Sequence, residues 1–487
     1  MTDGDLKNAG NSAENRGANY GDDSPVAAFA TSPGNSALTL IRCSGKGSID
    51  LFSSVFLSDK LKDAPGNTVI YGKIVKSGEI IDEVLVSVFR APKSYTGEDS
   101  LDICCHGGLS AGRSVMAVLN ETGFRCALPG EFTFRAFMNG KLDLTRSESV
   151  MELVSSKTET GRKHAVSRLC GSLEKEISEI KYQLVQVLAS AEIYLDYSED
   201  EVSADNLEEI EGILPNRGIA IDALSRLKKL SASWRVERIY QEGITLVIAG
   251  CPNAGKSSLF NLLLKEDRSI VTEIPGTTRD WIEAWVSIDG IPVRLIDTAG
   301  LRETSDTVER IGVDRSINIL KEADLVLYLI DGEYGITTED KKFINAKSDS
   351  HRHIFIWNKN DVTCPPQPFP LGNIKPICVS AKTRAGLDEL YAAIIKTIQK
   401  QAAGDSGFQL IDNGSAALGT ERQKKLVDAA CRALEEALAM TEREKNEPLD
   451  LIAPLLRDAV NSLGEITGEV STADILEEMF SRFCVGK

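Results

Sequence analysis

Several features that mark other protein classes are absent from this 487-residue sequence. No apolar run is long enough to span a bilayer, so the sequence predicts no membrane-spanning helix. The first two dozen residues are polar, rich in Gly, Asn and Asp, and lack the apolar core of a signal peptide. They predict a disordered tail over residues 1–23 of a cytoplasmic protein.

Disulfide and zinc signatures are missing as well. The ten cysteines form no CxxC pair, and no Cys/His cluster has the spacing of metal ligands. Without a secretory context, we expect reduced thiols that are mostly buried. His106, one of only four histidines, is interpreted as an ordinary surface or core residue.

The sequence has fewer basic than acidic residues. The 55 Lys and Arg residues are outnumbered by 72 Asp and Glu residues, which gives a net charge of −17. A broad, sequence-independent grip on nucleic acid is therefore not expected, although a local basic patch remains open. The hydrophobic content of 42% is ordinary for a soluble protein, and the length predicts about three domains.

The clearest motif lies at residues 250–257, which read Gly-Cys-Pro-Asn-Ala-Gly-Lys-Ser. An apolar run at 244–249 predicts a buried parallel strand before it, and residues 258–263 predict a helix after it. In that setting the backbone N–H groups of the loop wrap a polyphosphate. Lys256 would reach the β and γ phosphates, and Ser257 would bind Mg²⁺. A chance glycine-rich turn, the alternative, does not explain the flanking strand and helix.

A second motif predicts recognition of guanine. Residues 358–361 read Asn-Lys-Asn-Asp and follow an apolar strand. The carboxylate of Asp361 can accept hydrogen bonds from the N1–H and N2–H₂ edge of guanine, which adenine does not offer. The motif therefore indicates GTP and not ATP. The residues expected at the base are Asn358, Lys359, Asp361, Ser380, Ala381 and Lys382.

The segment between these motifs has the parts of a hydrolytic switch. Residues 297–300 read Asp-Thr-Ala-Gly, where Asp297 can hold Mg²⁺ through water and the N–H of Gly300 can meet the γ-phosphate. Leu301 stands where Ras-like proteins carry a glutamine that orients the attacking water. We expect Glu309 to position the water instead. No arginine finger is evident, so a cation could supply the missing charge, with Asn253 among its ligands.

The remaining pattern predicts the domain organisation. An apolar stripe from Leu169 to Ala191 predicts one long helix of a bundle, and residues 284–296 predict a hairpin. The fold class is thus α/β and all-α multidomain. It comprises an N-terminal α/β domain at 24–143, a helical domain in two parts at 144–242 and 401–487, and an inserted Ras-like P-loop GTPase domain with a mostly parallel sheet at 243–400.

These motifs resemble those of the MnmE (TrmE) family of tRNA-modification GTPases. The resemblance rests on their order, on polar clusters at 42–45, 95–108 and 129–143, and on the terminal residues 483–487, Phe-Cys-Val-Gly-Lys. It implies a homodimer that forms a heterotetramer with the FAD protein MnmG (GidA). The two proteins would add a carboxymethylaminomethyl or aminomethyl group to C5 of the wobble uridine of certain tRNAs. The carbon would come from 5-formyltetrahydrofolate or methylenetetrahydrofolate.

The resemblance also implies roles for single residues. Folate would meet Arg42, Asp102, Lys141 and Lys487; the family pattern usually has Glu at the position of Asp102 and Ile at that of Val485. Cys484 would act in tRNA modification and Glu309 on the water. K⁺ would bind at Asn253, Thr272, Ile274 and Thr277, activating hydrolysis by pairing two G domains, and Mg²⁺ would bind at Ser257 and Thr278. The further nucleotide contacts would be Ala254, Gly255, Lys256, Ser258, Glu273, Pro275, Gly276, Asp297, Thr298, Ala299 and Gly300.

Two other functions stay open at this point. One is a ribosome-assembly or signalling GTPase, which would be a switch without chemistry on RNA. The other is a one-carbon transfer enzyme that uses GTP only for regulation. Folate binding by the N-terminal residues would argue against the first, and independence of MnmG would favour the second.

Overall fold

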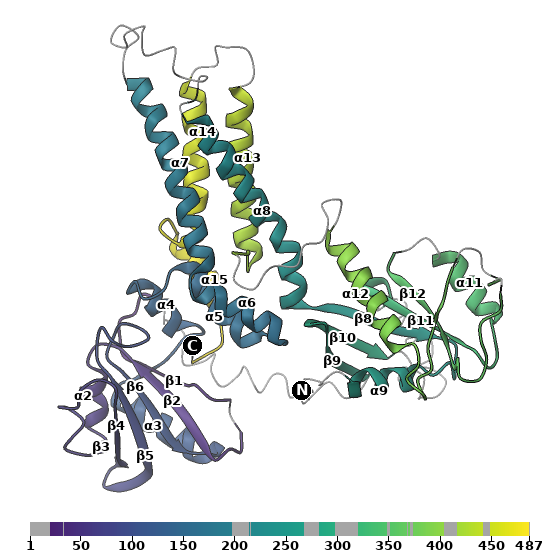
Figure 1. Ribbon diagram of the computed structural model, residues 1–487. Coiled ribbons are helices and arrows are strands. Elements are labelled where there is room, and N and C mark those ends of the chain that lie inside the picture. Colours follow the sequence, from purple (N-terminus) through teal and green to yellow (C-terminus); the bar gives the residue numbers. More distant parts are fainter. Residues whose placement is uncertain are drawn as a thin grey trace. The chain divides into compact units, whose positions relative to one another are not determined.

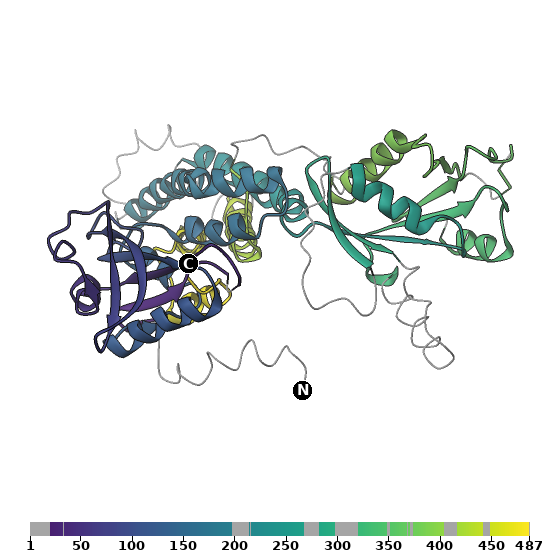
Figure 2. The same cartoon turned by 90° about the horizontal axis from the view of Figure 1, so that it is seen from below.

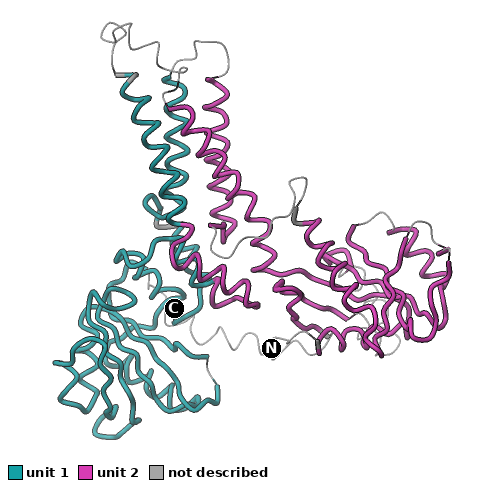
Figure 3. Tube along the Cα trace, viewed as in Figure 1, with its two compact units in different colours: residues 1–151, 174–215, 443–487 teal, residues 152–173, 216–442 magenta. Residues whose placement is uncertain are grey.

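The computed structural model describes residues 20–32, 34–196, 214, 216–266, 282–297, 320–347, 351–367, 369–370, 374–403, 416–441 and 449–486. The chain divides into two compact units (Figure 3). The first unit comprises residues 1–151, 174–215 and 443–487, and the second unit comprises residues 152–173 and 216–442.

A seven-stranded sheet forms the core of the first unit. Its strands are β1 (Val26–Phe29), β2 (Leu38–Ser44), β3 (Phe56–Leu57), β4 (Thr68–Lys76), β5 (Glu79–Phe89), β6 (Ser100–His106) and β7 (Arg125–Cys126). Their order is β3-β4-β5-β6-β2-β1-β7, and every neighbouring pair is antiparallel except β1 and β7. Helices α2 (Ser48–Ser53) and α3 (Leu109–Thr122) cover one face (Figure 2). Because strand residues alternate between faces, Ile41 and Cys43 are buried under these helices, and Arg42 lies on the opposite face.

The other helices of the first unit extend from this sheet (Figure 1). They are α4 (Glu131–Met138), the start of α5 (Leu144–Ser155), most of α7 (Ser172–Asp196), α14 (Leu449–Thr467) and α15 (Ala473–Ser481). Phe480 and Phe483 pack with Leu144 and with Phe134 of α4. The chain's C-terminal segment is therefore anchored beside α4. Helices α7 and α14 lie side by side, joined by the ion pair between Glu192 and Arg457.

A six-stranded sheet forms the core of the second unit. Its strands are β8 (Ile244–Gly250), β9 (Ile282–Ile288), β10 (Ile291–Asp297), β11 (Leu325–Asp331), β12 (His353–Asn358) and β13 (Ile377–Cys378), in the order β13-β12-β11-β8-β10-β9. All pairs are parallel except the hairpin of β9 and β10. Leu246 and Ile248 face α9 (Lys256–Glu266) and α12 (Leu387–Ala403), while Val247 and Ala249 face α11 (Thr338–Lys347).

Three further helices belong to the second unit: α6 (Glu159–Leu169), α8 (Arg217–Glu242) and α13 (Glu421–Met440). Helices α8 and α13 lie side by side (Figure 1), and Ser231 of α8 donates to Asp428 of α13 at 2.8 Å. Helix α8 runs into β8 through Gly243, where φ is +80° and a Cβ would lie 2.4 Å from the carbonyl oxygen of Pro292. The helix thereby leads directly into the central sheet.

The alternating strand and helix pattern of the second unit is confirmed, and so is the hairpin, whose turn residues Asp289 and Gly290 have φ of 52° and 79°. The single long helix expected from Leu169 onward is wrong. Leu169 ends α6, and Gly171, at φ 94°, separates it from α7. The limits of the three expected domains stay a prediction.

Two smaller expectations also need correction. The expected boundary of the disordered tail, after residue 23, lies too far along the chain. Tyr20 already packs on Phe134, at 5.2 Å between ring centroids, and donates to the carbonyl oxygen of Pro129. Residues 1–19 lie outside the described part of the chain. The expectation of mostly buried thiols is wrong, because only Cys43, Cys105 and Cys431 of the ten cysteines are buried. No helix in the described ranges is both long and apolar enough to cross a membrane.

Candidate functional sites

The phosphate loop connects β8 to α9, as the sequence predicts. At Gly255 φ is +91°, and a Cβ would lie 2.2 Å from Nδ2 of Asn358, so only glycine fits. Lys256 begins α9 and donates from Nζ to the carbonyl oxygens of Gly250 and Cys251 at 3.0 and 2.8 Å. The amine therefore lies over the loop, where it can neutralise a polyphosphate bound to the backbone N–H groups and the helix N-terminus.

Ser257 and Asp297 meet at the carboxyl ends of β8 and β10. The Oγ of Ser257 donates to Oδ2 of Asp297 at 2.8 Å, and Asp297 is completely buried. Hydroxyl and carboxylate oxygens are the ligand types that Mg²⁺ prefers, and parallel sheets bind ligands at this edge. The pair therefore fits a Mg²⁺ ion held by Ser257 and, through water, by Asp297. Within the described ranges, no group of three or more His, Cys, Asp and Glu side chains could hold a metal ion by itself.

Asn358 joins the phosphate loop to the loop expected at the base. Its side chain is buried at the end of β12. Nδ2 donates to the carbonyl oxygen of Ala254 at 2.7 Å, and Oδ1 accepts from the N–H of Ala381 at 3.3 Å. The side-chain amide of Asn358 thus links the phosphate loop to the loop of Ala381 and fixes their spacing.

The side chain of Asp361 is fixed in an orientation that suits a nucleotide base. Its Oδ1 accepts from the Oγ of Ser380 at 2.6 Å, and this hydrogen bond lowers the pKa of Asp361 below its usual range. The side chain is therefore a carboxylate at neutral pH and can accept from guanine. Lys359 is fixed nearby by ion pairs to Asp331 and Glu333 at 2.7 and 3.1 Å, and Lys382 is exposed in the turn after Ser380.

Part of the expected nucleotide site lies outside the described residues. Asn253 and Ser258 are described and exposed at the phosphate loop and the start of α9. The residues outside the described ranges are Thr272, Glu273, Ile274, Pro275, Gly276, Thr277, Thr278, Thr298, Ala299, Gly300, Leu301, Glu309 and, at the chain end, Lys487.

A second polar site lies on the face of the sheet opposite α2 and α3 in the first unit. Arg42 of β2 and Asp102 of β6 are directly opposite in register. Nε and Nη2 of Arg42 donate to Oδ1 and Oδ2 of Asp102 at 3.0 and 3.3 Å. The two side chains are 25% and 20% exposed, so an incoming ligand can reach them. Lys141 makes a different contact, donating from Nζ to the carbonyl oxygen of Pro92 at 3.0 Å.

The C-terminal segment lies beside this pair. The carbonyl oxygen of Gly486 is 3.5 Å from Nη1 of Arg42. At Gly486 φ is +94°, and a Cβ would lie 2.3 Å from the carbonyl oxygen of Phe29, so the segment is packed tightly against the end of β1. Cys484 is exposed, and its carbonyl oxygen accepts from the N–H of Gly130 at 3.2 Å. The structure thus places Gly486 of the terminal segment beside the pair of Arg42 and Asp102.

Two protein-family descriptions match the chain. The MnmE helical domain matches residues 144–484, and the GTP-binding protein TrmE N-terminus matches residues 25–141. The chain belongs to the MnmE family of tRNA modification GTPases. Membership confirms the class of enzyme that the sequence predicts, a GTPase of tRNA modification.

Individual relatives agree over nearly the whole chain. The tRNA modification GTPase MnmE of Treponema denticola is 43% identical over 479 residues, covering 95% of this chain and 98% of that protein. The MnmE of Borrelia recurrentis is 41% identical over 471 residues, covering 95% and 98%. Among solved structures, the G domain of the T. maritima FeoB iron transporter is 27% identical with a TM-score of 0.25, and the match covers 32% of this chain and 99% of that one.

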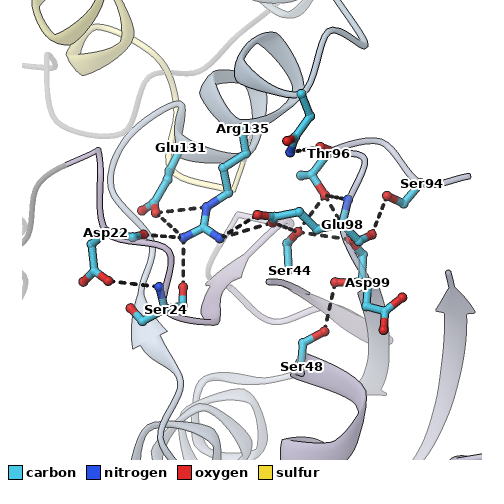
Figure 4. Close-up of polar contacts among 12 residues, drawn as sticks. Asp22, Ser24, Ser44, Ser48, Ser94, Thr96, Glu98, Asp99, Glu131 and Arg135 are labelled. Atoms are coloured by element: carbon cyan, nitrogen blue, oxygen red, sulfur yellow. Dashed lines mark hydrogen bonds and ion pairs between the residues drawn. The ribbon is translucent and has the colours of Figure 1, made fainter. Parts of the chain in front are cut away.

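The sequence patterns of this MnmE-family chain do not indicate the ionic network around Arg135 (Figure 4). Arg135 of α4 lies between Glu131, whose Oε1 is 2.8 Å from Nη2, and Glu98, whose Oε2 is 3.1 Å from Nη1. Glu131 is completely buried and also pairs with Arg125 at 2.6 Å. The only signal in the sequence is the unusual charge of the clusters at 95–108 and 129–143.

A second buried network lies in the second unit, on α5, α6 and α8. Arg168 pairs with Glu152 at 2.6 Å and with Glu237 at 2.7 Å. His164 Nδ1 lies 2.9 Å from the other oxygen of Glu237. Arg168 and Glu237 are 2% and 0% exposed, so the guanidinium and the carboxylates offset the cost of each other's burial inside the protein.

Proposed function

We propose that this protein hydrolyses GTP to drive the addition of a carboxymethylaminomethyl or aminomethyl group to C5 of the wobble uridine of certain tRNAs. In the proposal it acts in the cytoplasm as a homodimer and forms a heterotetramer with the FAD protein MnmG. The observation that carries the GTP part is the double hydrogen bond of Asn358 to the loops of Ala254 and Ala381. That bond supports one composite site for a triphosphate and its base.

Each side chain of this site has a defined task in the proposal. Lys256 neutralises the β and γ phosphates, and Asp361 accepts from the guanine edge. Ser257 and Thr278 hold Mg²⁺, which supplies charge stabilisation at the phosphates when bound. Glu309 orients the attacking water, since Leu301 has no polar group for that task. Asn253, Thr272, Ile274 and Thr277 are the proposed K⁺ ligands.

The N-terminal site would hold the one-carbon donor, 5-formyltetrahydrofolate or methylenetetrahydrofolate. Lys141 and Lys487 match the negative charge of the folate glutamate, and the pair of Arg42 and Asp102 can bind the edge of the pterin ring, where Asp102 accepts from N–H groups. The exposed pair of Arg42 and Asp102 supports this assignment, as does the carbonyl of Gly486 beside it. Cys484, on the same segment, is proposed to act in the modification step.

Nucleoside analysis of tRNA tests the proposal. A strain lacking this protein should lose the modified wobble uridines, and the wild-type gene should restore them. The Cys484→Ser variant should restore little modification but should hydrolyse GTP at the wild-type rate. Normal modification without the protein would refute the function. Full modification with Cys484→Ser would leave that thiol without a role, and a slower GTPase in this variant would show that the two sites are not separate.

Potassium should accelerate GTP hydrolysis relative to sodium at fixed ionic strength. The transition state spreads negative charge over the phosphate oxygens, and no arginine finger is evident to meet it. Asn253 is exposed on the phosphate loop with φ 63° and offers an amide oxygen there. We expect G-domain association with a γ-phosphate mimic in KCl only.

The control is Asn261→Ala, which removes an exposed amide from α9. This variant should keep the difference between the salts, and Asn253→Ala should lose it. Equal wild-type rates in KCl and NaCl would remove the cation from the mechanism. A potassium effect that persists in Asn253→Ala would keep the ion but place it elsewhere.

No specific observation favours a switch without chemistry on RNA. The family matches include the N-terminal residues and the helical segments as well as the GTPase residues, whereas a signalling switch explains only the last of these. A one-carbon enzyme that uses GTP only for regulation would be favoured by tRNA modification that does not depend on MnmG.

A further inference from the structure

The carboxylate of Asp340, in the first turn of α11, is buried and only 1% exposed. Its Oδ2 accepts from the N–H and the Oγ1 of Thr337 at 2.8 and 2.7 Å. In return, the N–H of Asp340 donates to Oγ1 of Thr337 at 3.1 Å. Because Thr337 directly precedes α11, these are the reciprocal hydrogen bonds of a capping box. The capping box uses only one oxygen of the carboxylate.

The other oxygen, Oδ1, contacts the central sheet and the phosphate loop. It accepts from the hydroxyl of Tyr328 on β11 at 2.9 Å and from the thiol of Cys251 at 3.2 Å. The ring of Tyr328 stacks on Phe343 of α11 at 4.2 Å between ring centroids, so this contact belongs to the packing of α11 on the sheet. Cys251 is the second residue of the phosphate loop, and its contact joins that loop to α11.

The thiol of Cys251 is suited to donate this hydrogen bond. Burial raises the pKa of Cys251, and the charge of the Asp340 carboxylate adds to the effect, so the thiol is protonated at neutral pH. A thiol is a weak donor, and a carboxylate is a stronger acceptor than a neutral group. The contact therefore fixes the Sγ of Cys251 against α11 from the side of the carboxylate.

The backbone of Cys251 continues the chain of contacts to Lys256. The carbonyl oxygen of Cys251 accepts from Nζ of Lys256 at 2.8 Å and from the N–H of Ala254 at 3.3 Å. The side chain and the carbonyl of one residue thus contact α11 and the amine expected at the phosphates. The phosphate-loop motif accepts any residue at position 251, so the sequence pattern assigns Cys251 no role.

We propose that Asp340 is a positioning residue of the GTP site, which acts through the thiol of Cys251 to fix the carbonyl group that holds Lys256. This inference rests on the proposed nucleotide site. It gives α11 a part in phosphate binding, although α11 contributes none of the motifs that predict that site. No covalent step is involved.

GTP binding by the full-length protein, measured with a fluorescent GTP analogue, tests the inference. Cys251→Ala removes the thiol and should weaken binding about 3- to 10-fold, the effect of one lost hydrogen bond. Cys251→Ser keeps a donor at this position and should bind within about twofold of wild type. Asp340→Asn should weaken binding at least as much as Cys251→Ala does. The double variant should bind no more weakly than Asp340→Asn alone, since both changes break one contact.

Tyr328→Phe is the matched control. It removes the other donor to the same oxygen of Asp340 but keeps the ring that stacks on Phe343. This variant should lose stability in urea unfolding and still bind GTP as wild type does. Comparing affinity with stability in all variants separates positioning of the phosphate loop from packing of α11.

Other results would contradict the inference in different ways. Equal weakening of GTP binding by Tyr328→Phe and Cys251→Ala would assign the effect to the packing of α11. Normal binding by Cys251→Ala, or failure of Cys251→Ser to restore it, would show that the thiol does not hold the loop. Additive losses in the double variant would separate Asp340 from Cys251. A wild-type protein that does not bind GTP would refute the proposed nucleotide site itself.

Discussion

Replacing Asp361 by asparagine should lower the affinity for GTP about 10- to 100-fold. The carboxylate offers two acceptors to the N1–H and N2–H₂ groups of guanine, and the amide replaces one acceptor with a donor. Loss of a charge-assisted hydrogen bond has an effect of this size. The hydrogen bond from Ser380 lowers the pKa of Asp361, so the carboxylate is present at neutral pH. Titration with a fluorescent GTP analogue measures the change.

A nucleotide whose base has an acceptor where guanine has a donor makes the test more specific. Xanthosine triphosphate carries a carbonyl oxygen where guanine has its amino group, so Asp361→Asn should bind it better than wild type does. Asp388→Asn is the matched control, because Asp388 is exposed on the first turn of α12. That variant should behave as wild type with both nucleotides. Unchanged GTP affinity in Asp361→Asn would remove the residue from the base site.

The nucleotide site could be predicted because each of its motifs is a short continuous stretch of the sequence. Lys256, Ser257 and Asp361 each follow an apolar run that forms a buried strand of a parallel sheet. Ligands bind such sheets where the strands end, so position along the chain implied position in space. The bond from Asn358 to Ala254 was not implied, because it depends on how two loops approach each other.

Features that depend on tertiary contacts could not be predicted in this way. Leu169 fits the apolar period of the following helix, but the glycine at 171 turns the chain at φ 94° and ends that period. In the sequence, Glu98 and Arg135 look like ordinary charged residues of a loop and a helix. Their ion pair forms only in the folded protein. Arg168 and Glu237 are 69 positions apart, and each alone looks like part of a solvated helix face.

Replacing Glu237 by glutamine should destabilise the second unit by about 3 kcal/mol. Breaking a buried ion pair costs about 3–5 kcal/mol, and the lower end applies because Arg168 keeps Glu152. Trp234, Trp281, Trp285 and Trp357, the four tryptophans, all belong to this unit. Urea unfolding followed by tryptophan fluorescence therefore reports on it selectively.

The stability lost in Glu237→Gln should be largest at neutral pH and should decrease in acid. Burial raises the pKa of Glu237, but the hydrogen bond from His164 and the charge of Arg168 outweigh it and hold the pKa below the usual range. A carboxyl whose pKa is lowered by folding stabilises the protein above its unfolded pKa of about 4.3 and loses that contribution as the pH falls through the folded value. Wild type and Glu237→Gln should therefore differ at pH 7, and the difference should shrink as the pH falls below about 4.3 and through the folded-state pKa of Glu237.

Glu242→Gln on the same helix is the matched control. Glu242 pairs with Arg238 at 2.6 Å, but the two side chains are 57% and 62% exposed. An exposed pair one helical turn apart contributes about 0.3–0.5 kcal/mol, so this variant should unfold almost as wild type does, at either pH. A similarly small effect of Glu237→Gln would mean that water reaches the network and that its charges are not buried in solution. A large effect that does not shrink as the pH falls through the folded-state pKa of Glu237 would assign the cost to lost packing, since the charge would then be absent from both proteins.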